Sequence, residues 1–125
     1  MKEKTIMIVD DSAFMRNHIQ GMLQRHGYHQ LLEAKDGETC VSLYQQQHPD
    51  VVLLDITMPD KSGIEVLEEL LTIDQDAKVV ICSALGQDQM MAKALRIGAK
   101  DFLVKPLKEE QLIELLKALT AYDEA

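Results

Sequence analysis

The chain has 125 residues, which is enough for one domain with a single hydrophobic core. Apolar residues make up 46% and charged residues 27%, an ordinary globular composition, and no apolar run is long enough to cross a bilayer. The net charge of -8 opposes attraction to nucleic acid or to an anionic membrane, so neither is expected as a direct partner.

The ends and the cysteines also limit the possibilities. Residues 1–4 are highly charged and the apolar stretch after them is short, which argues against a secretory signal and predicts a cytoplasmic location. Cys40 and Cys82 form no Cys-x-x-Cys pair, so we expect reduced structural thiols rather than a disulfide or a zinc site.

Short apolar segments alternate along the chain with segments of helical periodicity. The first strand is predicted at residues 5–10, and a helix follows it in which apolar side chains recur from Phe14 to Leu23 until Gly27 ends it. Further strands are predicted at residues 30–34, 51–55, 78–83 and 101–104, and further helices at residues 37–47, 64–73, 87–97 and 107–121.

This alternation predicts a parallel sheet with helices on both faces, because right-handed crossovers place successive helices there. No linker or low-complexity stretch interrupts it, so residues 1–125 are expected to form one doubly wound (βα)5 domain of the α/β class. The common strand order for this flavodoxin-like topology is 2-1-3-4-5, with strands one and three adjacent where the winding reverses. Ligands bind beyond the carboxyl ends of the strands at that point.

Both strands that meet at this point end in aspartate. Asp10 and Asp11 follow the first strand, and Asp55 ends the third. Two unit charges about 4 Å apart repel by about 4 kcal/mol at an effective dielectric constant near 20, so the cluster requires raised pKa values or a cation. Oxygen ligands without a neighbouring His or Cys favour a hard ion, and a few carboxylates with several waters is the usual environment of Mg2+.

A simpler interpretation is that Asp10 and Asp11 only cap the first helix and that Asp55 ends a strand by chance. The convergence of all three on one crevice argues against that coincidence. The loop after the first strand also lacks the glycines that bring backbone amides to a nucleotide or flavin phosphate. P-loop, Rossmann and flavodoxin-type phosphate sites are therefore disfavoured.

The last two predicted strands bring a hydroxyl group and an ammonium group to the same edge of the sheet. The fourth strand ends at Ser83 and the fifth is followed by Lys105. A lysine after an apolar strand is most often just solvated, but here its ammonium group faces the acidic cluster.

Four motifs at strand ends resemble one known family: Asp10-Asp11, the segment Leu53-Leu54-Asp55-Ile56-Thr57-Met58-Pro59 with Gly63, Ser83-Ala84, and Lys105-Pro106. Together they resemble the receiver-domain family of bacterial response regulators over essentially the whole chain. Residues 11–16, 55–59, 82–87 and 98–106 are most similar to chemotaxis receivers of the CheY type from Gram-positive and deep-branching bacteria. The resemblance implies the CheY-like fold.

The resemblance also implies a metal site and a phosphoacceptor. Asp55 would be the phosphoacceptor, Asp11 and Asp55 would bind Mg2+ together with the backbone carbonyl of Thr57, and Asp10 would act mainly through water. The chain would be a signalling switch rather than an enzyme, with at most self-catalysed phosphoryl transfer and autodephosphorylation.

The resemblance further implies how a signal leaves the site. Ser83 and Lys105 would contact the phosphoryl group, a cis peptide bond is expected before Pro106, and Phe102 would move inward when Ser83 moves. Core packing alone is the other interpretation of Phe102. Leu85, two residues beyond Ser83, is expected to hinder the hydrolytic water and to slow self-dephosphorylation.

The implied partners are a CheA-like sensor histidine kinase as phosphodonor and a flagellar motor switch protein or a phosphatase as output, with the chain itself a monomer. The output surface would comprise the fourth helix, fifth strand and fifth helix, where contacts are expected from Met90, Met91, Ala94, Leu107 and Lys108.

Two alternatives remain open. The first is a phosphorelay intermediate or phosphate sink without a motor target. The second is a Mg2+-dependent phosphohydrolase of the haloacid dehalogenase type, which also uses an aspartate at a strand end. That family needs an Asp-x-Asp motif and a substrate cap, and Asp10-Asp11-Ser12 provides neither.

Overall fold

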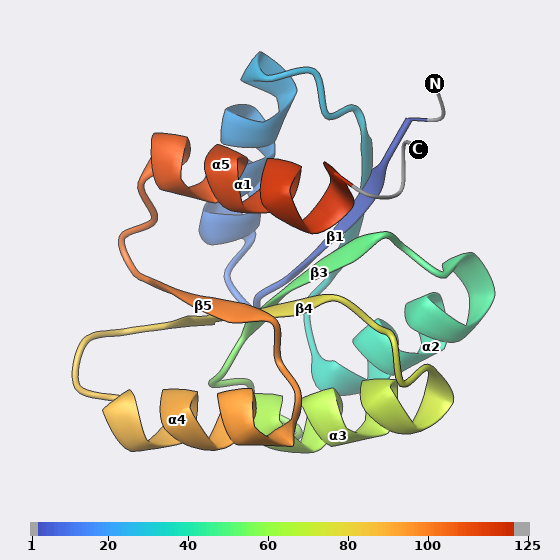
Figure 1. Ribbon diagram of the computed structural model, residues 1–125, viewed down its shortest axis with the longest axis vertical. Coiled ribbons are helices and arrows are strands. Elements are labelled where there is room, and N and C mark those ends of the chain that lie inside the picture. The colour runs from blue at the N-terminus through green and yellow to red at the C-terminus, as the bar shows by residue number, and fades with distance from the viewer. Residues whose placement is uncertain (1–2, 122–125) are drawn as a thin grey trace.

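The computed structural model describes residues 3–121 and places a five-stranded parallel sheet between two layers of helices (Figure 1). The strand order is β2-β1-β3-β4-β5, as predicted. The elements in chain order are β1 (Thr5–Val9), α1 (Ala13–Arg25), β2 (Gln30–Ala34), α2 (Gly37–Gln47), β3 (Val51–Asp55), α3 (Gly63–Ile73), β4 (Val79–Ser83), α4 (Asp88–Ile97), β5 (Asp101–Val104) and α5 (Glu109–Thr120).

Helix starts follow the local capping chemistry. The side chains of Ser12, Asp36 and Ser62 accept hydrogen bonds from the backbone of the first turns of α1, α2 and α3. Predicted boundaries agree with the structure at β2, α2, β3 and β5 and differ elsewhere by one or two residues, as at α5, which begins at Glu109. Asp10 lies just beyond β1, although its N–H still donates to the carbonyl of Ala34 in β2 at 3.1 Å.

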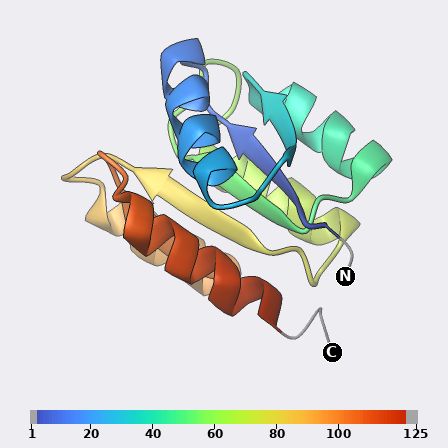
Figure 2. The ribbon, with the colours of Figure 1, turned by 90° about the horizontal axis from the view of Figure 1, so that it is seen from above.

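The helices cover the two faces of the sheet unequally. Figure 1 shows α1 and α5 on one face and α2, α3 and α4 on the other, and Figure 2 shows α1 and α5 in front of the twisted sheet. Alternate strand residues supply the two cores, with Ile8 and Leu53 on the α1 and α5 side and Val9 and Leu54 on the other. Burial on both faces explains why these strands are continuous apolar runs.

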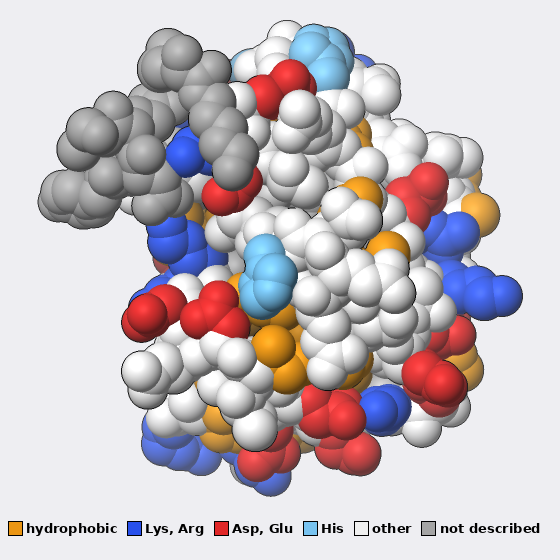
Figure 3. All heavy atoms as spheres, turned by 90° about the vertical axis from the view of Figure 1, so that its right-hand side faces the viewer, with side chains coloured by type: hydrophobic (Ala, Val, Ile, Leu, Met, Phe, Trp, Pro, Cys, Tyr) orange, Lys and Arg blue, Asp and Glu red, His pale blue; other side chains and the backbone are white. Residues whose placement is uncertain are grey.

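Both cysteines are buried and free, as expected. Burial raises the pKa of Cys40 and the pKa of Cys82 to about 12, so both remain neutral thiols. Within residues 3–121, none of the helices is long and apolar enough to cross a membrane. Acidic and basic side chains are interspersed on the face shown in Figure 3, without a continuous block of either sign.

Phe14 does not belong to the buried face of α1, although its spacing predicts that it does. Its side chain is 79% exposed, and its ring stacks on that of His18 at a centroid distance of 6.4 Å. Phe14 lies in the first turn of α1, and Ile19, Met22 and Leu23 in the later turns are the α1 residues that the core buries.

The predicted output surface is smaller than the sequence indicates. Met91, Ala94 and Leu107 are buried rather than available for contacts. Ala94 on α4 and Leu107 in the segment between β5 and α5 belong to the two cores. Met90 and Lys108 are the two of the five predicted residues that remain exposed.

Candidate functional site

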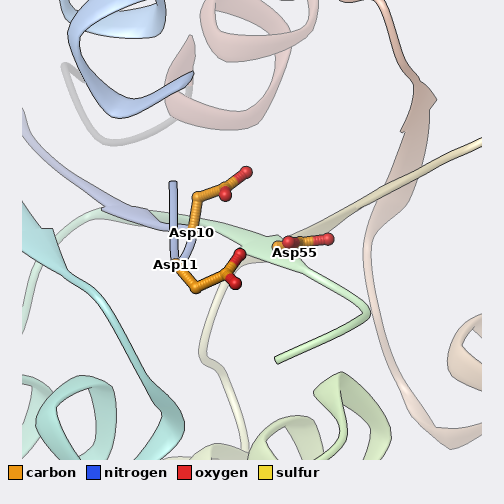
Figure 4. Close-up of side chains that lie close together, drawn as sticks. All are labelled: Asp10, Asp11 and Asp55. Atoms are coloured by element: carbon orange, nitrogen blue, oxygen red, sulfur yellow. The ribbon is translucent and has the colours of Figure 1, made fainter. Parts of the chain in front are cut away.

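Three aspartates converge at the edge where the strands end. Asp10 and Asp11 follow β1, Asp55 is the last residue of β3, and these two strands pair in parallel with Val9 opposite Leu54. One carboxylate oxygen of each aspartate lies within 4.8 Å of those of the other two (Figure 4). The convergence predicted from strand order and strand ends is therefore confirmed.

Lys105 is the cation of this cluster. Its Nζ lies 2.8 Å from Asp10 Oδ2 and 3.4 Å from Asp55 Oδ1. Its backbone N–H donates to the carbonyl of Ser83, which fixes the start of the β5–α5 connection beside the end of β4. The peptide bond between Lys105 and Pro106 is cis, as expected.

Asp10 is held by two protein donors. It is 3% exposed, and its Oδ2 accepts from Lys105 while its Oδ1 accepts from the Ser12 N–H at 2.9 Å. In this structure Asp10 thus orients Lys105 and the start of α1. Asp11, by contrast, is exposed and lines the pocket.

Burial and charge oppose each other at this site. Burial raises the pKa of Asp55, and the repulsion from Asp10 adds to it, whereas the attraction of Lys105 lowers it only in part. Burial would lower the pKa of Lys105, but the hydrogen bond with Asp10 and the charge of Asp55 raise it on balance. One ammonium group faces three carboxyl groups, so negative charge remains that a cation would neutralise.

A pocket of about 380 Å³ opens at the edge of the sheet that carries Asp55. Its lining combines carboxylates, an ammonium group, a hydroxyl and apolar side chains, from Asp11, Asp55, Thr57, Met58, Pro59, Ala84, Gln87 and Lys105. The available donors are oxygen atoms, which is the donor set that Mg2+ prefers, so the residues present fit that ion.

Ser83 ends β4, beside the strand that carries Asp55. It is fully buried, and its Oγ is the one buried side-chain polar atom without a hydrogen-bond partner between residues 3 and 121. An unpaired buried hydroxyl costs about 1–3 kcal/mol, and such a group in a native structure requires an explanation. A hydroxyl donor is thus available at the end of β4.

The loop after β3 is held in place by close backbone contacts. The Gly63 N–H donates to the Ile56 carbonyl at 2.8 Å, and a Cβ at position 63 would lie 2.6 Å from Ile56 Cα. The Asp60 carboxylate accepts from the N–H groups of Gly37 and Glu38, each at 3.0 Å, at the start of α2. These contacts fix the segment that directly follows Asp55.

Gln87 is the pocket residue that sequence analysis missed. Its Oε1 accepts from the Ala84 N–H at 2.8 Å, and its Nε2 donates to Thr57 Oγ1 at 3.1 Å. The sequence shows only a polar residue at a helix start, and no local signal reveals contacts between two loops. Leu85, expected beside Asp55, lies in a turn with Gly86, is 83% exposed and is not among the pocket-lining residues.

Phe102 lies on β5, where it pairs with Ile81 of β4. Its ring is partly buried and packs against the core on the α2, α3 and α4 side. Its position beside β4 is compatible with both interpretations from the sequence, a switch element and a packing residue.

The sequence pattern of the response regulator receiver domain matches residues 6–117, and the chain belongs to that family. Receiver domains are signalling switches rather than classical enzymes, and they bind Mg2+ at an acidic pocket. This corresponds to the cluster of Asp10, Asp11 and Asp55 and disfavours the phosphohydrolase alternative.

Within the family, the chain is closely related to CheY. It is 41% identical to the chemotaxis protein CheY of Thermotoga maritima over 94% of this chain and 98% of that protein. It is 43% identical to the chemotaxis protein CheY of Bacillus subtilis over 89% and 92% of the two chains. The CheX-CheY complex of Borrelia burgdorferi with BeF3 and Mg2+ contains a chain of the same fold, with a TM-score of 0.87 and 35% identity, covering 93% of this chain and 88% of that one.

Proposed function

We propose that this chain is a phosphorylation switch in chemotaxis, which accepts a phosphoryl group on Asp55 and then alters a partner-binding surface. The observation that carries the proposal is the convergence of three carboxylates within 4.8 Å, with the Lys105 ammonium against two of them. The close relation to CheY proteins supports the chemotaxis assignment.

Asp55 is the acceptor that the contacts favour. Asp10 already accepts from Lys105 and Ser12 and does not line the pocket, whereas Asp55 lines it at the end of β3. An oxygen of the Asp55 carboxylate attacks the phosphorus of a phosphohistidine, and the bond from phosphorus to the imidazole nitrogen breaks. The bonding electron pair stays with the imidazole, so no further reactant is needed.

Mg2+ would be held by the carboxylates of Asp11 and Asp55 and by the backbone carbonyl of Thr57. When bound, the ion supplies positive charge for the phosphoryl oxygens. Asp10 would act on the site through water and through its hold on Lys105.

Lys105 and Ser83 complete the proposed site. The Lys105 ammonium lies 3.4 Å from Asp55 and can neutralise a phosphoryl oxygen there. The unpaired Ser83 hydroxyl can donate to the same group, and its movement would let Phe102 shift inward from its partly buried position.

CheY-like receiver domains take phosphate from a histidine kinase such as CheA and act on motor or phosphatase partners. For this chain we propose a CheA-like kinase as donor and a flagellar motor switch protein or a phosphatase as output. We also propose that residues 1–125 act as one cytoplasmic, monomeric domain that catalyses its own phosphoryl transfer and autodephosphorylation.

Acetyl phosphate with Mg2+ provides the direct test. Intact-mass spectrometry should show one added phosphoryl group on the wild type and none on Asp55→Asn. Asp76→Asn is the matched control, because Asp76 is exposed at the opposite end of the sheet, before β4. Labelling of Asp55→Asn at the wild-type level would refute the assignment.

A second candidate, a phosphorelay intermediate or phosphate sink, is favoured by relatives whose names do not mention chemotaxis. The chain is 41% identical to Protein CcdB of Bacillus subtilis and 37% identical to Protein PilH of Pseudomonas aeruginosa. Binding of the phosphorylated chain to purified motor switch protein separates the candidates, since a sink would show no phosphorylation-dependent binding.

A further inference from the structure

The Gln87 side chain connects the two loops that border the acceptor. One end of its carboxamide accepts from the Ala84 N–H after β4, and the other end donates to the Thr57 hydroxyl after β3. All three residues line the pocket that contains Asp55. One side chain thus carries a hydrogen bond to each of the two loops.

Gln87 makes these contacts from the start of α4, where it does not cap its own helix. It occupies the N-cap position of α4, yet its side chain forms no capping hydrogen bond. Ser12, Asp36 and Ser62 occupy the same position in α1, α2 and α3, and each accepts from the first turn of its helix. Lys108 at the start of α5 also lacks a capping hydrogen bond, but the Gln87 carboxamide is the one of these N-cap side chains that reaches across the pocket, to Ala84 and Thr57.

The donor that Gln87 occupies lies next to the donor that has no partner. Ser83 Oγ is buried and unpaired, and the N–H of the following residue, Ala84, is bonded to Gln87. A phosphoryl group on Asp55 would bring three strong acceptor oxygens to this pocket. The Ala84 N–H can serve those oxygens only if Gln87 releases it.

We propose that Gln87 is a positioning residue that holds the pocket in its unphosphorylated arrangement and competes with the phosphoryl group for the Ala84 N–H. This rests on the proposed function of Asp55 as acceptor. Phosphorylation breaks the contacts of Gln87 with Ala84 and Thr57, and the loop after β4 moves with Ser83. Loss of the carboxamide therefore favours the phosphorylated arrangement.

Beryllium fluoride with Mg2+, used as a stable phosphoryl substitute, tests this at equilibrium. Gln87→Met keeps the length of the side chain and removes both hydrogen bonds. Because beryllium fluoride would no longer have to displace these hydrogen bonds, whose net strength is ordinary, it should bind roughly two- to tenfold more tightly. NMR titration of the uniformly 15N-labelled protein measures this affinity. Gln24→Met, an exposed substitution on α1, should bind as the wild type does.

The Ala84 amide supplies a signature that a general loss of stability would not produce. Its hydrogen exchange should be slowed in the free wild type and faster in Gln87→Met, while amides in β3 keep their protection. Thr57→Val removes one of the two contacts and should give part of the gain in affinity. The double variant should then equal Gln87→Met, because both substitutions act through the same carboxamide.

The outcomes separate the two proposals. If the wild type neither takes up phosphate at Asp55 nor binds beryllium fluoride, the proposed function fails and this inference fails with it. If the wild type does both but Gln87→Met binds beryllium fluoride equally or more weakly, or if the Thr57→Val effect is fully additive, the role of Gln87 is refuted alone.

Discussion

Lys105 Nζ and Asp55 Oδ1 lie 3.4 Å apart, although Asp55 ends β3, Lys105 follows β5, and β4 lies between these strands. The contact is possible because the lysine side chain reaches across the end of β4 to the acidic cluster. It makes Lys105 a counter-ion of both Asp10 and Asp55, and under the proposed function the same ammonium group would meet a phosphoryl oxygen.

Lys105→Met should destabilise the protein. Asp10 is 3% exposed and would keep the Ser12 N–H but lose its ionic partner at 2.8 Å, and leaving a buried acceptor oxygen without its partner costs about 1–3 kcal/mol. Urea denaturation at pH 7 measures the free energy of unfolding. Lys93→Met, on the exposed side of α4, should change it by less than about 0.5 kcal/mol. An equal effect of the two variants would show that the Lys105 ion pair adds no stability.

Asp55→Asn should stabilise the protein at neutral pH. Burial raises the pKa of Asp55, so the folded state holds its proton more tightly than the unfolded state does. Stability from this group is present below the ordinary aspartate pKa of about 3.9 and is lost as the pH rises through the higher folded-state pKa. The free energy of unfolding should therefore exceed that of wild type at pH 7, and the gain should shrink toward pH 4.

A retained ion pair and a control variant make this pH experiment specific for the Asp55 carboxylate. Lys105 keeps its contact with Asp10 in Asp55→Asn, so the substitution leaves no isolated ammonium group. Asp76→Asn, at an exposed position, should show no gain that depends on pH in this way. A gain for Asp55→Asn that is constant from pH 4 to pH 7 would contradict the assignment of the effect to the Asp55 carboxylate.

Added Mg2+ should raise the thermal stability of the wild type. A ligand that binds only the folded state at 100 times its dissociation constant stabilises it by about 2.7 kcal/mol. Asp11→Asn should weaken the effect, because Asp11 supplies a carboxylate to the cluster without contributing to the core. Differential scanning calorimetry measures the change in melting temperature. The samples contain Mg2+, sodium at equal ionic strength, or a chelator after addition of Mg2+. An equal response to sodium would indicate general screening rather than a site.

Gly63→Ala should destabilise the fold, because the new Cβ would lie 2.6 Å from Ile56 Cα and 2.9 Å from the Asp55 carbonyl oxygen. Overpacking of this kind costs about 1–3 kcal/mol. Gly21→Ala is the matched control, since its Cβ would meet nothing closer than 3.5 Å inside α1 and should stabilise by about 0.5–1 kcal/mol. Thermal unfolding of both variants should show a lower melting temperature for Gly63→Ala and a higher one for Gly21→Ala. A Gly63→Ala variant as stable as the wild type would refute the close approach of residue 63 to Ile56.

The sequence was sufficient for the fold class and for the acidic part of the site. Strand and helix periodicities are local properties, and their alternation limits the topology to a few parallel arrangements, of which the common strand order is the one observed. Since the carboxyl ends of parallel strands share one edge, Asp10, Asp11 and Asp55 could be placed together before any coordinates were known.

Only the tertiary structure decided contacts between segments that are distant in sequence. The pairing of Lys105 with Asp10, the two hydrogen bonds of Gln87, the exposure of Phe14 and the burial of Met91 belong to this group. Periodicity shows that a helix has an apolar face, but the packing angle of the helix and the side-chain rotamers decide which residues that face covers. For that reason the acidic cluster was predictable, whereas the hydrogen bonds of Gln87 between the two neighbouring loops were not.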